Sequence, residues 1–476
     1  MTEPNSQQRV IFNGVDTSSK VFVRSVKGRF RNFKTAMLLL AYSVYFLLPW
    51  LRWDRISGPD QAVLFDLDAR LFYIFGLVMH PQDVVWLTAF LIIAAYLLFF
   101  VTGVLGRVWC GYFCFHTLWL DTYTFIERLV QGERPARLRL SKQAWNAEKI
   151  FKLSVTFLLY LLVAFITGFT FIIYWGNAPE MFFGFFAGEL DSAAYITVAI
   201  LTASTFMLAG FAREQLCKSV CPYARFQAAM FDRDTLIIAY DEKRGESENG
   251  RAKAAKENKT AEQRKKNGVG DCVDCGLCVQ VCPTGIDIRD GLQNDCISCG
   301  LCIDACNQIM TRQGWPTGLI RYTSEREVTM GIRPKYFKPK NIGYALAFVG
   351  GSVWLGWNML NQDPMDVSVR KIRQPMYVQL SDGRYQNNYE LKVNNKTQQT
   401  VDLGLVIEGL KKPEVDLGRI KELKLKPEQT LTVLVKIRYK RIKHSNGQQP
   451  FEFVLVPKNI VFDPIRDSAL FYTPKY

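Results

Sequence analysis

Three things are missing from this sequence of 476 residues, and each absence restricts its interpretation. No cysteine follows Cys306, so the later part of the chain has no disulfide with which to stabilise a fold. The first 34 residues contain no apolar core, which argues against a cleavable signal peptide. Asp, Glu, Lys and Arg are all absent from five long segments, which are 35–51, 84–106, 153–179, 192–212 and 341–362.

The five uncharged segments predict membrane spans. About 20 apolar residues in a helix cross the hydrocarbon core of a bilayer, and five such segments in one chain are not expected of buried soluble helices. The formal net charge is +15. Because the basic residues flank the apolar segments, this charge indicates an anionic membrane surface rather than nucleic acid. We therefore expect a multi-pass protein of the bacterial inner membrane.

Lys and Arg also predict the orientation, because basic loops stay in the cytoplasm. Residues 1–34 contain seven of them and residues 107–152 contain eight, whereas residues 52–83 contain three together with five Asp. This pattern places the N-terminus in the cytoplasm. After five spans, the C-terminus lies in the periplasm.

Residues 363–476 have a different pattern, in which apolar and polar residues alternate. The alternation is clear in 389–393, 400–407, 431–437 and 451–456, and a period of two predicts strands with one buried face. Turn signals near Gly383, Lys396 and Gly447 separate these strands at spacings that suit a small β-sandwich. An immunoglobulin-like fold here would lack the usual disulfide between its sheets.

All twelve cysteines lie between residues 110 and 306, on or near the predicted cytoplasmic side. That compartment is reducing, which favours metal ligation or redox chemistry over disulfides. Eight of them form two C-x2-C-x2-C-x3-C runs, the bacterial ferredoxin pattern in which the fourth cysteine of each run ligates the other cluster. The pattern predicts two 4Fe–4S clusters, one on Cys272, Cys275, Cys278 and Cys306 and the other on Cys296, Cys299, Cys302 and Cys282. A pair of structural zinc sites is the alternative.

The residues between these cysteines also carry predictions. Gly276 and Gly300 permit the sharp turn between the second and third ligand of each run. Pro283 ends the first run, whereas the second run has Asn307 at that position. The segment 241–268 just before them has almost nothing apolar to bury, so we expect a solvated linker or an exposed helix.

The remaining four cysteines form two C-x3-C pairs, Cys110 with Cys114 and Cys217 with Cys221, after the second and fourth predicted spans. An i,i+4 spacing places two thiols on one helical face, and soft thiolates select Cu(I) over harder ions. Copper is therefore a sensible occupant, with another iron–sulfur centre, zinc or simple helix packing as alternatives. His116 is a further candidate ligand, and the cations that would favour thiolates are Lys218, Arg213 and Arg225.

With these motifs in view, the chain resembles the CcoG/FixG/RdxA family, accessory proteins for assembly of the cbb-type haem–copper oxidase. The similar segments are 109–114, 213–222, 240–246, 270–310, 382–384 and 388–392. Family members commonly have Pro-Gln after the first C-x3-C pair, where this chain has Phe115-His116.

The resemblance implies a cupric reductase that uses its clusters to reduce Cu(II) to Cu(I) for insertion into the oxidase. Implied partners are oxidase assembly factors or a copper transporter or chaperone, together with a cytoplasmic electron donor, and no nucleic acid. The alternatives are a quinol-linked electron-transfer protein similar to NapH and NosR, and a non-enzymatic copper-binding assembly scaffold.

The fold class we expect is a multi-domain membrane protein, in which a five-helix transmembrane bundle carries an inserted two-cluster ferredoxin-like domain and a C-terminal immunoglobulin-like β-sandwich. Its expected parts are a cytoplasmic tail (1–34), transmembrane helices 1–4 (35–212), a cytoplasmic linker and ferredoxin-like domain (213–340), transmembrane helix 5 (341–362) and a periplasmic domain (363–476).

Overall fold

The computed structural model describes residues 21–55, 58–252, 258, 260–361, 363–397, 399–418, 420, 422–427, 429–440, 447–460 and 462–474. Most of the expected N-terminal tail lies outside these residues. The chain divides into two compact units, which we describe separately. The first contains residues 1–51, 61–73 and 79–355, and the second contains 52–60, 74–78 and 356–476.

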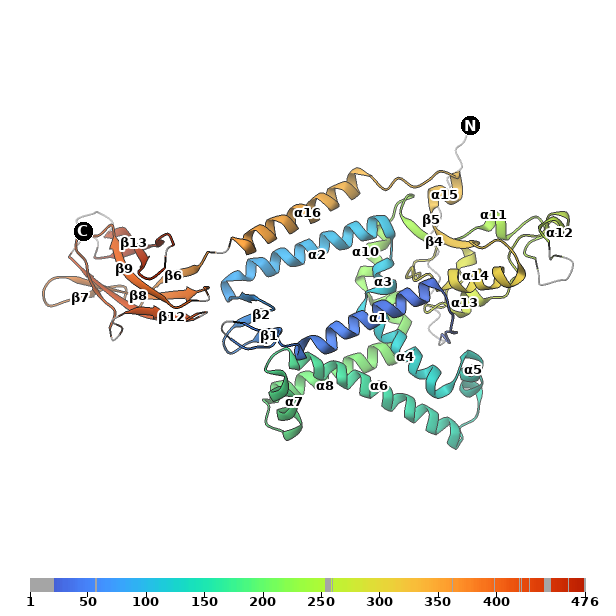
Figure 1. Cartoon of the computed structure of the whole chain (residues 1–476), viewed down its shortest axis with the longest axis horizontal. Coiled ribbons are helices and arrows are strands. Elements are labelled where there is room, and N and C mark those ends of the chain that lie inside the picture. Colours follow the sequence, from blue (N-terminus) through green and yellow to red (C-terminus); the bar gives the residue numbers. More distant parts are fainter. Residues whose placement is uncertain are drawn as a thin grey trace. The chain divides into compact units, whose positions relative to one another are not determined.

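Five long helices coincide with the five uncharged segments (Figure 1): α1 (Arg29–Leu47), α2 (Val84–Leu105), α6 (Ala147–Ile173), α8 (Ser192–Met207) and α16 (Pro339–Leu360). Within the described residues, four segments are long and apolar enough to cross a membrane, namely Arg29–Trp50, Val84–Leu105, Ala147–Ile173 and Ser192–Gln227. With 22 residues α16 is equally long, but its glycines and asparagines dilute its apolar character. The fifth span therefore stays a prediction.

The limits of the helices differ from those of the uncharged segments by up to six residues, since α1 and α6 each begin six residues earlier. The helix α6 begins at Ala147 because Asn146 caps it, accepting a hydrogen bond from the Lys149 N–H. It ends at Ile173, and the separate helix α7 (Ala178–Ala187) follows. The segment after α8 continues as two π-helical turns, η3 (Leu208–Ala212) and η4 (Leu216–Val220), on either side of α9 (Arg213–Gln215).

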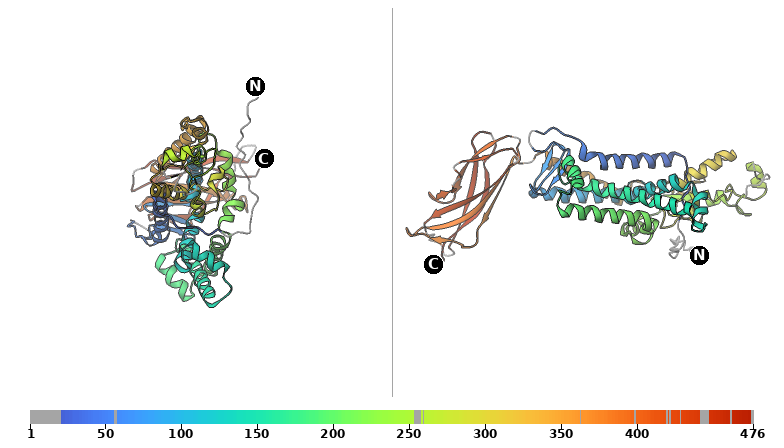
Figure 2. Two further views of the ribbon diagram at one scale, coloured as in Figure 1. Left: turned by 90° about the vertical axis from the view of Figure 1, so that its right-hand side faces the viewer. Right: turned by 90° about the horizontal axis from the view of Figure 1, so that it is seen from below.

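Shorter elements connect these helices: η1 (Leu48–Trp50), β1 (Val63–Asp66), β2 (Leu71–Ile74), β3 (Leu77–Met79), η2 (Pro81–Asp83), α3 (Val108–Tyr112), α4 (Phe115–Gln131), α5 (Arg134–Lys142) and α10 (Pro222–Met230). In the right-hand view of Figure 2, α1, α6 and α8 all lie lengthwise, whereas Figure 1 shows α1 and α6 inclined in opposite senses.

Close packing joins α4, α6 and α8. The ring of Tyr123 on α4 stacks on that of Tyr160 on α6 with 4.1 Å between centroids, and its hydroxyl donates to the Tyr160 carbonyl. On α6, Gly168 admits α8, because a Cβ there would lie 3.0 Å from the Val198 carbonyl oxygen.

The cysteine-rich part of the first unit is built on one antiparallel pair of strands. The strand β4 (Leu236–Tyr240) pairs with β5 (Ile320–Ser324), and the remaining elements are α11 (Glu242–Gly245), α12 (Ala261–Lys266), α13 (Leu277–Gln280), η6 (Ile288–Asp290), α14 (Leu301–Gln313) and α15 (Glu325–Met330). One strand precedes both cysteine runs in the sequence and the other follows them. The two ends of the cysteine domain are therefore joined by main-chain hydrogen bonds.

The segment 241–268, predicted to be a solvated linker or an exposed helix, contains the largely exposed helix α12, but the prediction is wrong at Arg264. This side chain is 3% exposed, its guanidinium lies 3.8 Å from the centre of the Trp315 ring, and it donates to Asp271 at 2.8 Å. A buried arginine in a charged segment needs such partners, and both of them follow the segment in sequence.

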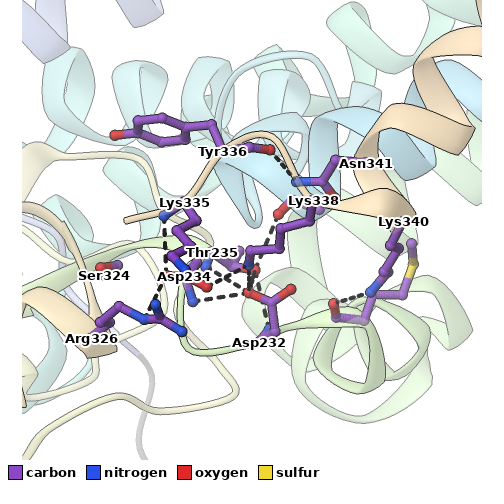
Figure 3. Close-up of polar contacts among 12 residues, drawn as sticks. Asp232, Asp234, Thr235, Ser324, Arg326, Lys335, Tyr336, Lys338, Lys340 and Asn341 are labelled. Carbon is purple, nitrogen blue, oxygen red and sulfur yellow. Dashed lines mark hydrogen bonds and ion pairs between the residues drawn. The ribbon is translucent and has the colours of Figure 1, made fainter. Parts of the chain in front are cut away.

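Two aspartates in the loop between α10 and β4 hold the segment that leads into α16 (Figure 3). Asp234 accepts from the Lys335 N–H at 3.1 Å and pairs with Arg326 at 2.9 Å, while Lys338 pairs with both Asp232 and Asp234. Burial disfavours the Asp234 carboxylate, but these donors outweigh it and lower its pKa. The start of α16 is thereby fixed to the cysteine domain.

The second unit contains a β-sandwich of two antiparallel sheets. One sheet has the order β10-β12-β8-β6, with β7 also paired to β8, and the other has the order β11-β9-β13-β14. The strands are β6 (Met365–Lys371), β7 (Val378–Gln379), β8 (Tyr385–Asn395), β9 (Val401–Glu408), β10 (Glu414–Asp416), β11 (Leu423–Leu425), β12 (Thr430–Tyr439), β13 (Gln448–Pro457) and β14 (Ile465–Tyr472). All four predicted strands are confirmed.

Aromatic packing joins the two sheets of the sandwich. Tyr389 on β8 is fully buried, and its ring lies 5.4 Å from that of Phe451 and 5.5 Å from that of Phe453, both on β13. Its hydroxyl donates to the Leu470 carbonyl at 2.8 Å. Burying large aromatic rings from both sheets supplies the stability that a cysteine pair would otherwise add.

Candidate functional site

The two cysteine runs form loops of matching backbone conformation. Asp274 and Ser298, each just before the second cysteine of its run, both have φ of 52°. The glycines after those cysteines, Gly276 with φ of 64° and Gly300 with φ of 72°, lie in the left-handed region. The predicted sharp turns are confirmed, and each leads directly into a helix, α13 or α14.

Two neighbouring cavities lie inside these loops. The first, with an open volume of ≈ 390 Å³, is lined by Cys272, Cys275, Cys278 and Cys306. The second, of ≈ 340 Å³, is lined by Cys282, Cys296, Cys299 and Cys302, with Cys278 at its edge. Each cavity thus gathers one of the two predicted ligand sets, including the cysteine contributed by the other run. The four-thiol donor sets fit the cubanes that the sequence predicts.

The difference between Pro283 and Asn307 has a structural reason. In the first run the helix ends at Gln280, before Cys282. In the second run α14 continues to Gln313 and carries Cys306 within it, which a proline at position 307 would prevent. The Asn307 side chain instead accepts a hydrogen bond from the Gly318 N–H at 2.9 Å.

Burial raises the pKa of the Cys278 thiol to about 12, although the nearby Arg289 guanidinium opposes the shift. Arg289 lines the first cavity and pairs with Asp287 and Asp274. Since ligands must be deprotonated, a group bound in this cavity has to displace protons from the thiols. A fixed cation beside the cavity favours that step.

The four membrane cysteines lie at the helix ends that follow α2 and α8. Cys110 is on α3 and Cys114 precedes α4, whereas Cys217 is in η4 and Cys221 precedes α10. Burial raises the pKa of Cys110 to about 12, and the thiols of Cys114, Cys217 and Cys221 add to the shift. All four therefore surround one region. Within the described residues, however, no three His, Cys, Asp or Glu side chains are close enough to hold a single ion.

The residues beside the four membrane cysteines have other roles than the sequence predicts for His116 and Arg213. The His116 ring is buried and its Nε2 lies 2.9 Å from the Arg213 carbonyl oxygen, while burial lowers its pKa; it serves packing. Arg213 itself pairs with Glu127 at 2.7 Å. The cation that acts on the Cys110 thiol is Arg107, the N-cap residue of α3, which sequence reasoning missed.

The helix α3 packs directly on the loop of the second cavity. The Tyr112 hydroxyl donates to the Cys299 carbonyl at 2.8 Å, and Arg107 donates to the Asn294 carbonyl. A Cβ at Gly111 would lie 2.7 Å from the Ile297 carbonyl oxygen. Cys110 consequently belongs to the same apolar cluster as Cys299 and Leu301, so the membrane cysteines and the second cavity are neighbours.

A second contact joins this loop to α1. The Asp304 carboxylate on α14 accepts from the N–H groups of Arg31, at 2.8 Å, and Phe30, at 3.4 Å. It therefore caps the N-terminus of α1, where a negative charge is stabilising. Phe30 packs against Gly300, where a Cβ would lie 2.6 Å from its ring.

Comparison with known proteins identifies these parts. A 4Fe–4S dicluster domain family matches residues 212–325, a 4Fe–4S binding domain family matches 86–131, and the family described as an IG-like fold at the C-terminus of FixG matches 355–471. Protein RdxB of Cereibacter sphaeroides is 39% identical over 86% of this chain and 87% of its own length. The chain belongs to the FixG/RdxA family.

Other members of the FixG/RdxA family are comparably similar. Protein RdxA of Cereibacter sphaeroides is 39% identical over 82% of both chains, and nitrogen fixation protein FixG of Rhizobium meliloti is 34% identical over 82% of this chain and 79% of its own length. A crystal structure of a FixG-related protein from Vibrio parahaemolyticus is 28% identical, covering 23% of this chain and 96% of that chain, with a TM-score of 0.20. The chain is an iron–sulfur electron-transfer protein with several apolar helices.

Proposed function

We propose that this FixG/RdxA protein is a membrane-bound reductase that delivers electrons to Cu(II) at its four membrane cysteines, for assembly of a cbb-type cytochrome c oxidase. The observation that carries the proposal is the contact of Cys110 with the second cysteine loop, through the shared apolar cluster and the Tyr112 hydrogen bond. The resemblance to copper-related oxidase accessory proteins supplies the substrate.

The residues that would hold the clusters are the two cysteine sets that line the cavities, Cys272, Cys275, Cys278 and Cys306 for one, Cys282, Cys296, Cys299 and Cys302 for the other. Bound 4Fe–4S clusters supply reversible one-electron oxidation and reduction. Cys275 is exposed, whereas Cys299 is buried. The first cavity is thus open to a soluble electron donor, and the second is directed towards the membrane cysteines.

Cu(II) is the substrate of the proposed reaction, and each ion takes up one electron to become Cu(I). The donor is a reduced protein or small molecule on the cytoplasmic side. Soft thiolates stabilise Cu(I) relative to Cu(II), so Cys110, Cys114, Cys217 and Cys221 favour the product. Among the described residues, no three of these side chains lie close enough to hold one ion, so binding would require the two C-x3-C pairs to approach each other.

A second occupant of the membrane cysteines is favoured by one observation. The 4Fe–4S binding domain match over 86–131 includes Cys110 and Cys114, and the thiols of Cys217 and Cys221 lie near enough to act on the pKa of Cys110. A third iron–sulfur centre at this position would continue the electron route instead of binding copper. Iron analysis separates the two possibilities, because only the third centre adds iron beyond that of the two cysteine runs.

Reduced protein with intact clusters is expected to be reoxidised by Cu(II), and serine at Cys110, Cys114, Cys217 and Cys221 is expected to abolish Cu(I) retention and slow the reoxidation. The measurement follows the cluster absorbance, which is bleached when the protein is reduced and recovers when Cu(II) reoxidises it. Cu(I) is assayed with a chelator. Ser219→Ala changes the same segment between Cys217 and Cys221 without removing a thiol and serves as the control. Wild-type protein that Cu(II) does not reoxidise would favour the assembly scaffold.

Gly111→Ala tests the route from the cysteine domain to the membrane cysteines. The new methyl group would lie 2.7 Å from the Ile297 carbonyl oxygen and 3.1 Å from the Cys299 Cα, so α3 must move away at an overpacking cost of about 1–3 kcal/mol. We expect slower reoxidation by Cu(II) with unchanged iron content. Gly343→Ala on α16, where nothing lies within 4 Å, is the matched control and should leave the rate unaltered.

The same proposal includes the topology. Five spans with α16 as the last place the cysteine domain in the cytoplasm and the β-sandwich in the periplasm, as the distribution of Lys and Arg predicts. The partners would be oxidase assembly factors or a copper transporter or chaperone on the membrane. Quinol-linked transfer similar to that of NapH and NosR is the alternative if Cu(II) fails as an acceptor while quinols reduce the clusters.

A further inference from the structure

A basic cavity lies where the segment before α1 meets α4 and the cysteine loops. It has an open volume of ≈ 500 Å³, and its charged lining residues are Arg24, Arg31, Lys34, Asp121 and Arg128. One carboxylate thus faces four cations. The two threonines of its wall, Thr117 and Thr124, lie on α4, so the lining is polar as well as basic.

The single carboxylate is already engaged by the lining itself. Asp121 accepts two hydrogen bonds from the Arg31 guanidinium, each of 2.8 Å. Burial would raise its pKa, but the charges of Lys34, Arg31 and Arg128 outweigh this and lower it. Its one negative charge is therefore shared among three cations, and the cavity keeps an excess of positive charge.

The surroundings of Lys34 give the clearest indication that the cavity binds an anion. Its side chain is 2% exposed, and its ammonium lies 3.8 Å from an Asp121 oxygen, beyond hydrogen-bond distance. Among the described residues, no side chain or carbonyl accepts a hydrogen bond from it, and Arg128 has no ion pair. The Lys34 ammonium therefore shares its counter-ion, Asp121, with Arg31, and a further anion in the cavity would stabilise both cations.

The position of the cavity indicates which class of anion it binds. Lys34 and Arg31 belong to the first turns of the candidate span Arg29–Trp50, and if this helix crosses the bilayer they would lie at the depth of the lipid phosphates. The opposite wall contains Pro283 and Leu301, which adjoin Cys282 and Cys302. Guanidinium groups bind phosphate through paired hydrogen bonds.

We propose that this cavity binds a phosphate group, carried either by the headgroup of an anionic lipid or by a small soluble phosphate. The binding groups are Lys34 and Arg128, with Arg24 at the open side, while Arg31 stays paired with Asp121. A site of this kind is independent of the acceptor of the electrons. A phosphate bound there would link the segment before α1 to α4.

The test uses the full-length protein in detergent with its iron intact. Phosphatidylglycerol and phosphatidylcholine are offered separately, with bound lipid counted by native mass spectrometry, and inorganic phosphate is titrated by calorimetry. The variants are Lys34→Gln and Arg128→Gln, and the control is Arg139→Gln, which removes an exposed charge on α5. Arg128→Gln leaves the Arg31–Asp121 pair in place, so the test stands even if Lys34→Gln does not fold.

Each variant is expected to weaken binding of the phosphate probe about tenfold, as for the loss of one charge-assisted hydrogen bond, with Arg139→Gln unchanged. Dependence on these residues for phosphatidylglycerol alone identifies the lipid headgroup. The same dependence for inorganic phosphate identifies a soluble ligand. The proposal is overturned if neither probe binds, or if binding of both is the same in the wild type, Arg128→Gln and Arg139→Gln.

Discussion

Cys306→Ser is expected to remove about half of the bound iron, and the iron lost is that held by the other cysteine run. Cys306 follows Cys302 on α14, yet it lines the first cavity together with Cys272, Cys275 and Cys278. A 4Fe–4S cluster is held by four thiolates, and serine is a much poorer ligand for iron. The cluster of the first run should therefore be lost while that of the second run remains.

Double variants make this result specific. If Cys306 and Cys272 serve one cluster, Cys306→Ser combined with Cys272→Ser loses no more iron than either single variant. Cys306→Ser combined with Cys296→Ser should lose nearly all of it. Iron and acid-labile sulfide analysis, with spin resonance of the reduced protein, gives the readout. The opposite pattern of losses would show that each run holds its own cluster.

Cys282→Ser is the mirror control, because this residue lines the second cavity with Cys296, Cys299 and Cys302. It should spare the cluster that Cys306→Ser destroys. Its effect also separates loss of a ligand from misfolding, since a misfolded domain would lose both clusters in either variant.

The division of the eight cysteines into two ligand sets could be predicted from the sequence, because the ligand pattern is local and repeated. Gly276 and Gly300 supply the positive φ that each loop needs, and the two spacings are the same. The strands of the β-sandwich could be predicted equally well, because alternating apolar and polar residues mark the buried face of β8, β9, β12 and β13. Such features need no knowledge of distant residues.

The contacts between the cysteine domain and the helices could not be predicted in this way. Tyr112 and Cys299 are 187 residues apart, and nothing near Tyr112 indicates that its hydroxyl meets a carbonyl of the cysteine loop. Arg264 was placed in solvent because its neighbours in sequence are charged, whereas Trp315 covers it. The positions of these residues are set by tertiary packing, which overrides local composition.

The buried acid Glu127 on α4 was also missed, and Glu127→Gln is expected to lower the free energy of unfolding by about 3–5 kcal/mol. Its carboxylate pairs with Arg137 at 2.8 Å and with Arg213 at 2.7 Å. The Glu127 and Arg137 side chains are only 2% and 1% exposed. Removing the negative charge leaves two guanidinium groups away from water without a counter-ion, whose desolvation is then uncompensated.

Glu148→Gln is the matched control, because Glu148 also pairs with a cation, Lys152, at 2.6 Å but lies on the surface of α6. Exposed pairs of this kind are screened by solvent and contribute little to stability. Thermal unfolding of the two variants in the same detergent, followed by tryptophan fluorescence, gives the comparison. Equal stabilities would show that the Glu127 charge is dispensable.

The Glu127 variant should also disturb the membrane cysteines, because Arg213 immediately precedes the segment that carries Cys217. The Arg213 carbonyl lies 2.9 Å from His116 Nε2, and its backbone has a positive φ of 42°, a conformation that the ion pair with Glu127 helps to hold. Once that pair is broken, the backbone just before η4 is held less firmly. We expect faster reaction of Cys217 with a maleimide in Glu127→Gln than in Glu148→Gln, at a temperature where both proteins remain folded.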